Sequence, residues 1–226
     1  VNTDYCKEHK IDIFRRKSGG GCIYADKGCI QFSYISRSVN ANEAFAAYMQ
    51  RMADLLKGLK IDAQLSGRND ILINGTKVSG CAFYQLSNRS VLHNSLLFDT
   101  QLDHLSNALT PAKEKLQSKG VASVRQRVTN VATYTQLDIL AFMDYVRQEM
   151  CGTEVLELTE EDMKEVAEIE KELSSDDFVY GKNPKYSLVR KHRFEGVGTL
   201  EAHIELKNNI IGSINMVGDY FLLGDI

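Results

Sequence analysis

The chain has 226 residues, 43% of them hydrophobic and 25% charged, so it can bury a sizeable core. The formal net charge is −3, from 27 basic and 30 acidic side chains, and this balance argues against general binding to DNA or RNA. No apolar run approaches the roughly 18 residues that span a bilayer, and no signal-peptide pattern opens the sequence. We therefore expect a cytoplasmic protein that binds neither nucleic acid nor membranes.

The first predicted elements are short strands followed by one helix. Alternating apolar and polar residues indicate strands over 11–16, 21–26 and 28–36. Residues 40–61 carry apolar side chains at spacings of three and four, which is typical of an amphipathic helix that Asn40 or Asn42 could cap.

Residues 61–85 predict a strand, a turn, a strand, a turn and a strand. Asn74–Gly75 between the last two is a strong hairpin signal. Another strand is expected over 90–99, followed by a helix over 100–109. Residues 112–131 are basic and less regular.

The last part of the chain differs in character. A second amphipathic helix is predicted over 135–150, and an acidic helix follows, with Thr159 and Asp162 fitting a capping box. Residues 179–196 are rich in turn formers and predict a loop, and a terminal hairpin is expected around Asn208–Asn209. We place a domain boundary near residue 152, between a larger domain over 1–152 and a smaller α+β module over 153–226.

The five cysteines are odd in number and widely spread. They form no Cys-x-x-Cys pair, and the five histidines form no His-Glu-x-x-His motif, so the sequence carries no zinc signature. Reduced, partly buried thiols are expected.

The stretch RRKSGGGCIYAD, residues 15–26, is the first candidate for chemistry. Three consecutive glycines cost backbone entropy, but they allow bare backbone to approach a ligand. The stretch is neither a P-loop nor a dinucleotide fingerprint, because it lacks the Lys of the first and does not open a helix. Arg15 and Arg16 are suited to phosphate or carboxylate. By itself the stretch fits a glycine turn with surface arginines equally well.

A second candidate lies in SGRNDILINGTKVSG, residues 66–80. If Asn74–Gly75 turns the chain, Asn69, Asp70 and Lys77 could lie at one end or on one face of a sheet. Asn and Asp oxygens suit Mg²⁺ or ribose, and a lysine on a strand is placed to meet a fixed negative charge.

Together these stretches resemble the lipoate–protein ligases of the biotin/lipoyl ligase superfamily, whose patterns are RRxSGGGxVYxDxG and GRNDxxxxGxKxSG. KGVASVRQRVTN, residues 119–130, is similar to a third pattern of the family, KGxxSVRxRVxN. DDFVYGKNPKYS and GDYF resemble its small accessory domain more weakly. The resemblance implies an α+β fold related to class II aminoacyl-tRNA synthetases, with a mixed, largely antiparallel sheet.

The resemblance also implies the activity. Such ligases use Mg²⁺ and ATP to convert lipoate into lipoyl-AMP and pass the lipoyl group to a lysine of lipoyl domains of 2-oxo acid dehydrogenase complexes or of the glycine cleavage H protein. Lys77 would be the catalytic lysine, Asp70 would lie near Mg²⁺, and residues 121–128 would form a mobile loop around the adenylate. The nucleotide and lipoyl-AMP would be bound by Arg16, Ser18, Gly19, Gly20, Gly21, Cys22, Ile23, Tyr24, Asn69, Asp70, Lys77, Ser79, Gly80 and His93.

The sequence also departs from the family. Where relatives have a double His followed by Gly-Thr, only His93 remains, followed by Asn94 and Ser95, which affects the substrate pocket more than the adenylation chemistry. Relatives carry a leading segment that this chain lacks, and the accessory domain ends early, so we expect the protein to be longer at both ends.

Three other functions remain open at this point. An octanoyltransferase of the same superfamily would need an activated cysteine. The stretch KIDAQLSGRND, residues 60–70, where the transferases carry their nucleophile, holds none, and Cys81 fits a structural strand position. A biotin ligase is disfavoured by the form of the glycine motif. A binding protein that retained the fold without turnover is the third alternative.

Overall fold

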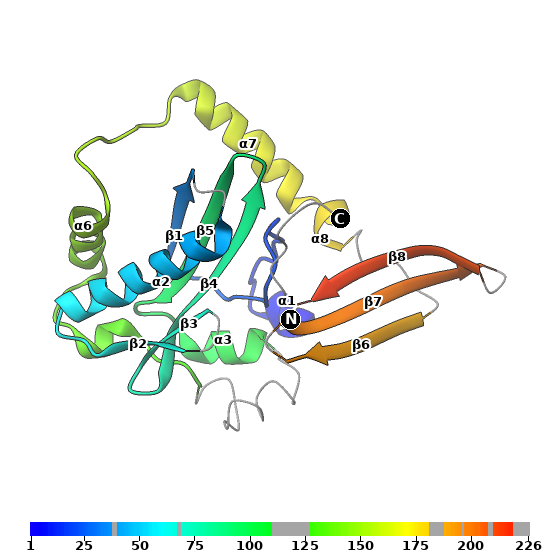
Figure 1. Cartoon of the computed structure of the whole chain (residues 1–226), viewed down its shortest axis with the longest axis horizontal. Coiled ribbons are helices and arrows are strands. Elements are labelled where there is room, and N and C mark those ends of the chain that lie inside the picture. The colour runs from blue at the N-terminus through cyan, green and yellow to red at the C-terminus, as the bar shows by residue number, and fades with distance from the viewer. Residues whose placement is uncertain are drawn as a thin grey trace. The chain divides into compact units, whose positions relative to one another are not determined.

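The computed structural model describes residues 1–37, 40–66, 69–109, 127–180, 188–195, 197–207 and 210–218. These residues form two compact units (Figure 1). The first contains residues 1–10 and 22–155, and the second contains residues 11–21 and 156–218. The early stretch 11–21 therefore groups with the C-terminal part of the chain. No shift in composition indicates this grouping.

The first unit is built on a five-stranded antiparallel sheet with the strand order β1-β5-β4-β3-β2. Its strands are β1 (Cys29–Ser36), β2 (Ala63–Ser66), β3 (Asp70–Ile73), β4 (Thr76–Leu86) and β5 (Arg89–Leu97). The predicted hairpin at Asn74–Gly75 is confirmed. Both residues have positive φ, 49° and 75°, as a type I′ turn requires.

Helix α2 (Ala41–Gly58) covers one face of this sheet (Figure 1) and packs against β2, β4 and β5. The side chain of Asn40 caps the helix by accepting a hydrogen bond from the Glu43 N–H. Met52 and Leu56 lie one turn apart and are fully buried. Each contributes about 1.5–3 kcal/mol of burial free energy. The apolar residues that predicted this helix are therefore the ones that it buries against the sheet.

Shorter helices complete the first unit: α1 (Thr3–Glu8), α3 (Leu102–Ala108), the 3₁₀ turn η1 (Val131–Tyr134) and α6 (Ile139–Met150). The Tyr5 hydroxyl lies 2.8 Å from His104 Nδ1 and joins α1 to α3. Phe142 of α6 packs against Phe98 with ring centroids 4.9 Å apart. The helices predicted over 100–109 and 135–150 are thus confirmed, whereas α1 was not predicted.

Two predicted strands are wrong. Residues 11–16 and 21–26 contain no strand, because neither stretch pairs with another segment. Arg15 instead donates two hydrogen bonds from its guanidinium to the Val179 carbonyl, at 3.0 and 2.8 Å. The predicted loop over 179–196 is wrong in part, because Leu188–Phe194 forms strand β6.

The second unit contains α7 (Glu160–Ser174), α8 (Asp176–Tyr180) and an antiparallel sheet of β6, β7 (Gly198–Lys207) and β8 (Ile210–Gly218), in that order. The predicted capping box is confirmed, because Thr159 and Asp162 exchange both hydrogen bonds. The terminal hairpin is confirmed by the pairing of Lys207 with Ile210. The two Asn residues at its predicted turn lie outside the described residues.

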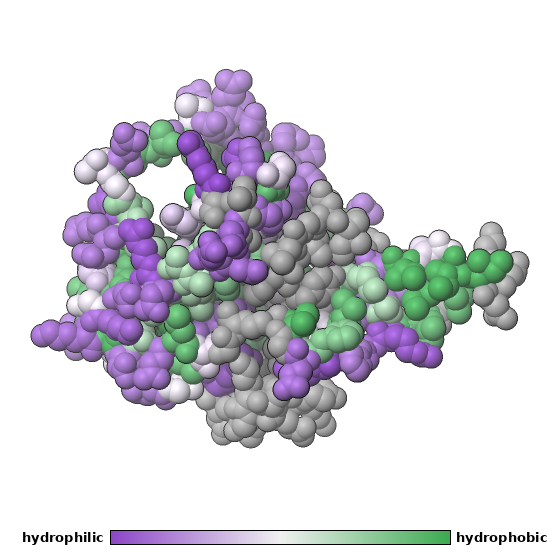
Figure 2. Space-filling view, viewed as in Figure 1, coloured by the Kyte–Doolittle hydropathy of each residue, from purple (hydrophilic) through white to green (hydrophobic). Residues whose placement is uncertain are grey.

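One face of this second sheet is largely apolar over β7 and β8. Leu188, Ile204 and Ile214 are cross-strand neighbours and therefore share a face, and Ile214 is 50% exposed. Figure 2 shows the hydrophobic side chains gathered along β8 and β7. Among the described residues, no helix is long and apolar enough to cross a membrane.

Candidate active site

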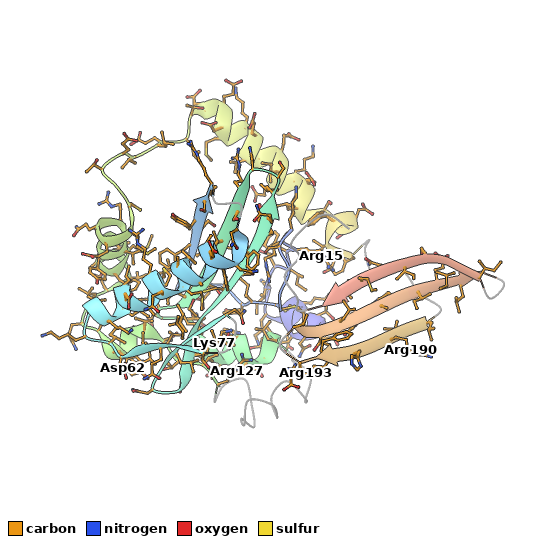
Figure 3. The ribbon with its side chains drawn as sticks, viewed as in Figure 1. Arg15, Asp62, Lys77, Arg127, Arg190 and Arg193 are labelled. Carbon is orange, nitrogen blue, oxygen red and sulfur yellow. The ribbon has the colours of Figure 1, made fainter. Side chains whose placement is uncertain are left out.

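A buried carboxylate joins two cations where β3 begins. Asp70 Oδ1 lies 2.7 Å from Lys77 Nζ, and Asp70 Oδ2 lies 2.9 Å from an Arg127 terminal nitrogen. The carboxylate side chain is 5% exposed, whereas those of Lys77 and Arg127 are 23% and 17% exposed. Figure 3 shows that Lys77 and Arg127 lie close to each other in the first unit. The two cations therefore meet at a single anion while water can still reach them.

The β3–β4 hairpin brings Asp70 and Lys77 together. Asp70 pairs across the strands with Gly80, and an irregularity in the register between Ile71 and Leu72 offsets the strands near Lys77. The Lys77 ammonium lies over Gly80, because a β-carbon built there would be only 2.6 Å from Nζ. Because Gly80 has no side chain, it leaves the space that the Lys77 ammonium occupies.

Residues 127–129 are fixed beside Lys77 by main-chain bonds. Thr129 N–H donates to the Lys77 carbonyl at 3.0 Å, and Val128 forms a parallel bridge with Lys77. These bonds place Arg127 independently of its side-chain ion pair. The rest of the predicted mobile loop, residues 121–126, lies outside the described residues.

The face of the sheet that carries Lys77 is opposite to the face that α2 covers. Phe83 packs on Phe45 of α2, with ring centroids 5.0 Å apart, so the alternate β4 positions, Gly80 and Ala82, point the other way. Gly80 pairs with Ser95, and Ala82 pairs with His93. The neighbours of Gly80 on this face are therefore small or polar, and the predicted residue His93 lies on the same face as Lys77.

Asn69 closes the end of this hairpin. Its side-chain amide donates to the Cys81 carbonyl at 2.9 Å, and Cys81 N–H donates to the Asn69 carbonyl at 2.8 Å. Asn69 therefore fixes the strand end that positions Asp70. Arg68, its neighbour in the motif, lies outside the described residues.

Ser79 lies on the α2 side of the sheet, away from Lys77. Its hydroxyl accepts a 2.9 Å hydrogen bond from the Asn94 amide, and Asn94 in turn accepts one from the Tyr48 hydroxyl. Ser79 and Asn94 are each 1% exposed. The Ser79 side chain is therefore part of a buried chain of hydrogen bonds between α2, β4 and β5. Asn94, which departs from the family pattern, is the middle member of this chain.

The glycine stretch of the second unit is organised by Arg16. Its guanidinium donates to the Ser18 hydroxyl at 3.0 Å and to the carbonyls of Gly19 and Gly21, both at 2.9 Å. Gly20 has a φ of +101°, which favours glycine, and a β-carbon there would be 3.1 Å from the guanidinium. The loop thus wraps around the arginine, which the sequence pattern alone did not indicate.

Beyond this loop, the end of the motif at Asp26 and Gly28 has a structural role. Asp26 accepts hydrogen bonds from the N–H groups of Gly28 and Gln101, at 2.9 and 2.8 Å. A β-carbon at Gly28 would be 2.0 Å from the Asp99 carbonyl oxygen, so no other residue fits. Asp26 and Gly28 therefore join the segment before β1 to the segment after β5.

Cys22, Ile23 and Tyr24 follow the glycines and belong to the first unit. Cys22 and Ile23 are exposed. Tyr24 stacks on His104, with ring centroids 6.5 Å apart, and its burial and the nearby Asp26 raise the pKa of its hydroxyl. The side chains of Cys22 and Ile23 are therefore accessible to a ligand, whereas that of Tyr24 is partly covered.

All five cysteines lie in described segments and are free. Cys81 is 2% exposed, and burial raises the pKa of its thiol to about 12. A thiol with this pKa carries almost no thiolate at neutral pH and is a poor nucleophile. This position therefore fits a structural cysteine.

Asp70 does not fit a direct Mg²⁺ ligand in this arrangement, because each of its oxygens already faces a cation. No group of three or more His, Cys, Asp or Glu side chains that could hold a metal occurs within the described segments. Asp70 pairs with both cations in this structure, and the metal role predicted for it stays a prediction.

Comparison with known proteins places these residues in context. The sequence profile of the lipoyl protein ligase A/B catalytic domain matches residues 1–151, and that of the bacterial lipoate protein ligase C-terminus matches residues 183–226. The lipoate–protein ligase LplJ of Bacillus subtilis is 34% identical over 236 residues, covering 100% of this chain and 71% of the relative. Lipoate–protein ligase 1 of Staphylococcus aureus is 35% identical over 237 residues, with the same two coverages.

A solved structure agrees with the sequence relatives. The bipartite lipoate protein ligase of Thermoplasma acidophilum, described with its E2 lipoyl domain, has a TM-score of 0.68 and 27% identity. The match covers 83% of this chain and 78% of that one. The α+β ligase fold predicted from the motifs is therefore confirmed.

Proposed function

The chain belongs to the lipoate–protein ligase family, and from that premise we propose that it activates lipoate with ATP and transfers the lipoyl group to a lysine of an acceptor protein. In the first step a lipoate carboxylate oxygen attacks the α-phosphorus of ATP. The bond from that phosphorus to the pyrophosphate oxygen breaks, and lipoyl-AMP and pyrophosphate are formed. In the second step a neutral lysine amine attacks the acyl carbon, the bond from that carbon to the AMP oxygen breaks, and AMP and one amine proton leave.

The observation that carries this proposal is the placement of Lys77. A carboxylate is already a nucleophile, so adenylation requires two anions to be brought together and the growing phosphate charge to be neutralised. Lys77 stands on a sheet strand, over a glycine and against a buried carboxylate, so its charge is held in place before the ligand arrives. We assign it to the lipoate carboxylate and the α-phosphate.

The remaining site residues are assigned as nucleotide or lipoyl-AMP contacts on the strength of the family motifs. They divide into the Arg16-centred loop, the segment after it, and the β3–β5 face. These groups comprise Ser18, Gly19, Gly20 and Gly21, then Cys22, Ile23 and Tyr24, and finally Asn69, Gly80 and His93. The Ser79 hydroxyl is engaged in the buried chain with Asn94, so its part is confined to positioning β4.

Mg²⁺ enters only as the ion that accompanies ATP. The acceptors we propose are lipoyl domains of 2-oxo acid dehydrogenase complexes and the glycine cleavage H protein, in line with the lipoyl domain described with the archaeal relative. We propose the cytoplasm as the compartment, because the reaction consumes ATP and all five thiols are free.

A direct test uses the purified protein with ATP, Mg²⁺, lipoate and a lipoyl domain. Mass spectrometry should find one lipoyl group on the acceptor lysine, and none when ATP is omitted or when that lysine is changed to Arg. Modification from a lipoyl or octanoyl thioester without ATP would instead establish the transferase. Adenylate binding without turnover would establish the binding protein.

A further inference from the structure

We propose that Asp70 acts as an internal stand-in anion, which holds Lys77 and Arg127 where a phosphate will meet them and makes Arg127 a second cation of the adenylation site. This inference rests on the proposed function. It assigns Arg127, which the sequence placed only within the loop over 121–128, to the ligand and gives Asp70 a positioning role in place of a metal-ligand role.

The first argument is the geometry of the carboxylate. One oxygen of Asp70 faces Lys77 and the other faces Arg127, at 2.7 and 2.9 Å. The separation of the two carboxylate oxygens therefore sets the distance between the two cations. A phosphate presents oxygens at comparable separations, so cations positioned in this way are preorganised for it.

The second argument is the gradient of burial. The Asp70 side chain is 5% exposed and lies beneath the two cations, which are 23% and 17% exposed. An incoming anion therefore reaches the cations from the solvent side while the carboxylate remains below them. In the ligand-free protein, the negative charge of the carboxylate offsets the repulsion between Lys77 and Arg127. It also reduces the net positive charge that the ligand meets.

The third argument is that the position of Arg127 does not depend on Asp70 alone. Thr129 and Val128 are joined to the Lys77 main chain, so the backbone of Arg127 stays near the lysine if the carboxylate is neutralised. A change at Asp70 therefore alters the charge and alignment of the two cations more than their presence.

These arguments predict a split between binding and turnover. In Asp70→Asn, two cations face the ligand without the competing carboxylate, so ATP should bind several-fold tighter. The cations lose their alignment with the charge that develops at the α-phosphorus, so pyrophosphate exchange should slow on the order of 10²-fold. A residue that only supported the fold would weaken binding and turnover together.

The experiment measures ATP affinity by calorimetry without lipoate, lipoate-dependent ATP–pyrophosphate exchange, and thermal unfolding, on the wild type and on Asp70→Asn. Arg127→Gln and Arg127→Lys provide the second measurement in case Asp70→Asn does not fold. Arg127→Gln should weaken ATP binding and slow exchange. Arg127→Lys should retain much of both, because the contact to Asp70 uses one nitrogen.

The matched controls are Arg147→Gln and Asp144→Asn. These residues form a comparable Arg–Asp contact of 3.1 Å on α6, with both side chains 64% exposed, and neither change should alter affinity or rate. Unchanged or weaker ATP binding by folded Asp70→Asn, or wild-type exchange by Arg127→Gln, would overturn the inference. No exchange by the wild type would instead overturn the proposed function, and this outcome is distinguishable because ATP affinity is measured without lipoate.

Discussion

The ammonium of Lys77 lies over the α-carbon of Gly80, so close that a β-carbon on Gly80 would be 2.6 Å from Nζ. The obstructing atom is the end of a flexible side chain, and the backbone around Gly80 leaves room for a methyl group. Gly80→Ala should therefore fold, but it should move the lysine away from Asp70. We expect lipoate-dependent ATP–pyrophosphate exchange to fall by about 10²-fold, with little change in thermal unfolding.

Gly152→Ala is the matched control for that change, because nothing lies within 4 Å of a β-carbon there. It should exchange pyrophosphate as the wild type does. Full activity in Gly80→Ala would show that the position of the lysine head in this structure is not the one used in adenylation.

Arg16 and Arg15 are neighbours with different partners, which allows their roles to be separated. Arg16→Gln removes the donor that holds Ser18, Gly19 and Gly21, and Arg15→Gln removes two bonds to Val179. We expect Arg16→Gln to weaken ATP binding by at least about tenfold, because a charge-assisted donor set worth about 1.5–3 kcal/mol is lost. Arg15→Gln should leave ATP affinity unchanged. Equal effects of the two substitutions on calorimetric ATP affinity would refute this separation.

Asn94 is expected to be a stability residue. Asn94→Leu keeps the size of the side chain but leaves the Tyr48 hydroxyl and the Ser79 hydroxyl without this partner in a buried place. The free energy of unfolding should fall by about 1–3 kcal/mol for each hydroxyl left without a hydrogen-bond partner. Denaturant unfolding should show this loss, whereas Asn88→Leu at an exposed turn should be close to neutral. A neutral Asn94→Leu would mean that the polar chain contributes nothing to the fold.

Cys81 gives a prediction about alkaline pH. Burial raises the pKa of its thiol from 9.0 to about 12, so the folded state holds this proton more tightly than the unfolded state. The resulting stability is fully present below pH 9 and is lost as the pH rises from 9 towards 12. Cys81→Ser has no such titration, so its melting temperature should fall less steeply than that of the wild type over this range. Parallel curves would contradict the assignment.

The same variant tests the thioester mechanism. Since a buried thiol of this pKa is a poor nucleophile, Cys81→Ser should keep most lipoylation activity. Complete loss of activity in a folded Cys81→Ser protein would favour the acyltransferase mechanism, in which Cys81 forms the thioester.

Local patterns predicted the parts of this fold whose signals are local. The apolar period of α2 and the Asn74–Gly75 turn are set by residues within a few positions of each other, and both are confirmed. Strand β6 was missed because its charged residues, such as Lys191, hide the alternation and its partner is a later strand. Residues 11–16 alternate like a strand but pair with no strand in the part of the chain that the structure describes, so alternation alone gave the wrong structure.

The site shows the same limit. Lys77 and Asp70 share one motif, and their proximity follows from the hairpin between them. Arg127 is 57 residues from Asp70, and only the tertiary fold brings the two together. The two cationic partners of Asp70 could not be counted from the sequence, and its predicted metal role stays a prediction. The roles of the other predicted site residues remain predictions.

The measurement that tests the central claim most directly is ATP–pyrophosphate exchange with lipoate, octanoate and biotin in parallel, on the wild type, Lys77→Ala and the exposed control Lys57→Ala. We predict exchange that requires lipoate and Mg²⁺, is absent with biotin, is lost in Lys77→Ala and is retained in Lys57→Ala. Folded wild-type protein that exchanges with none of the three acids, or full exchange in Lys77→Ala, would contradict the account.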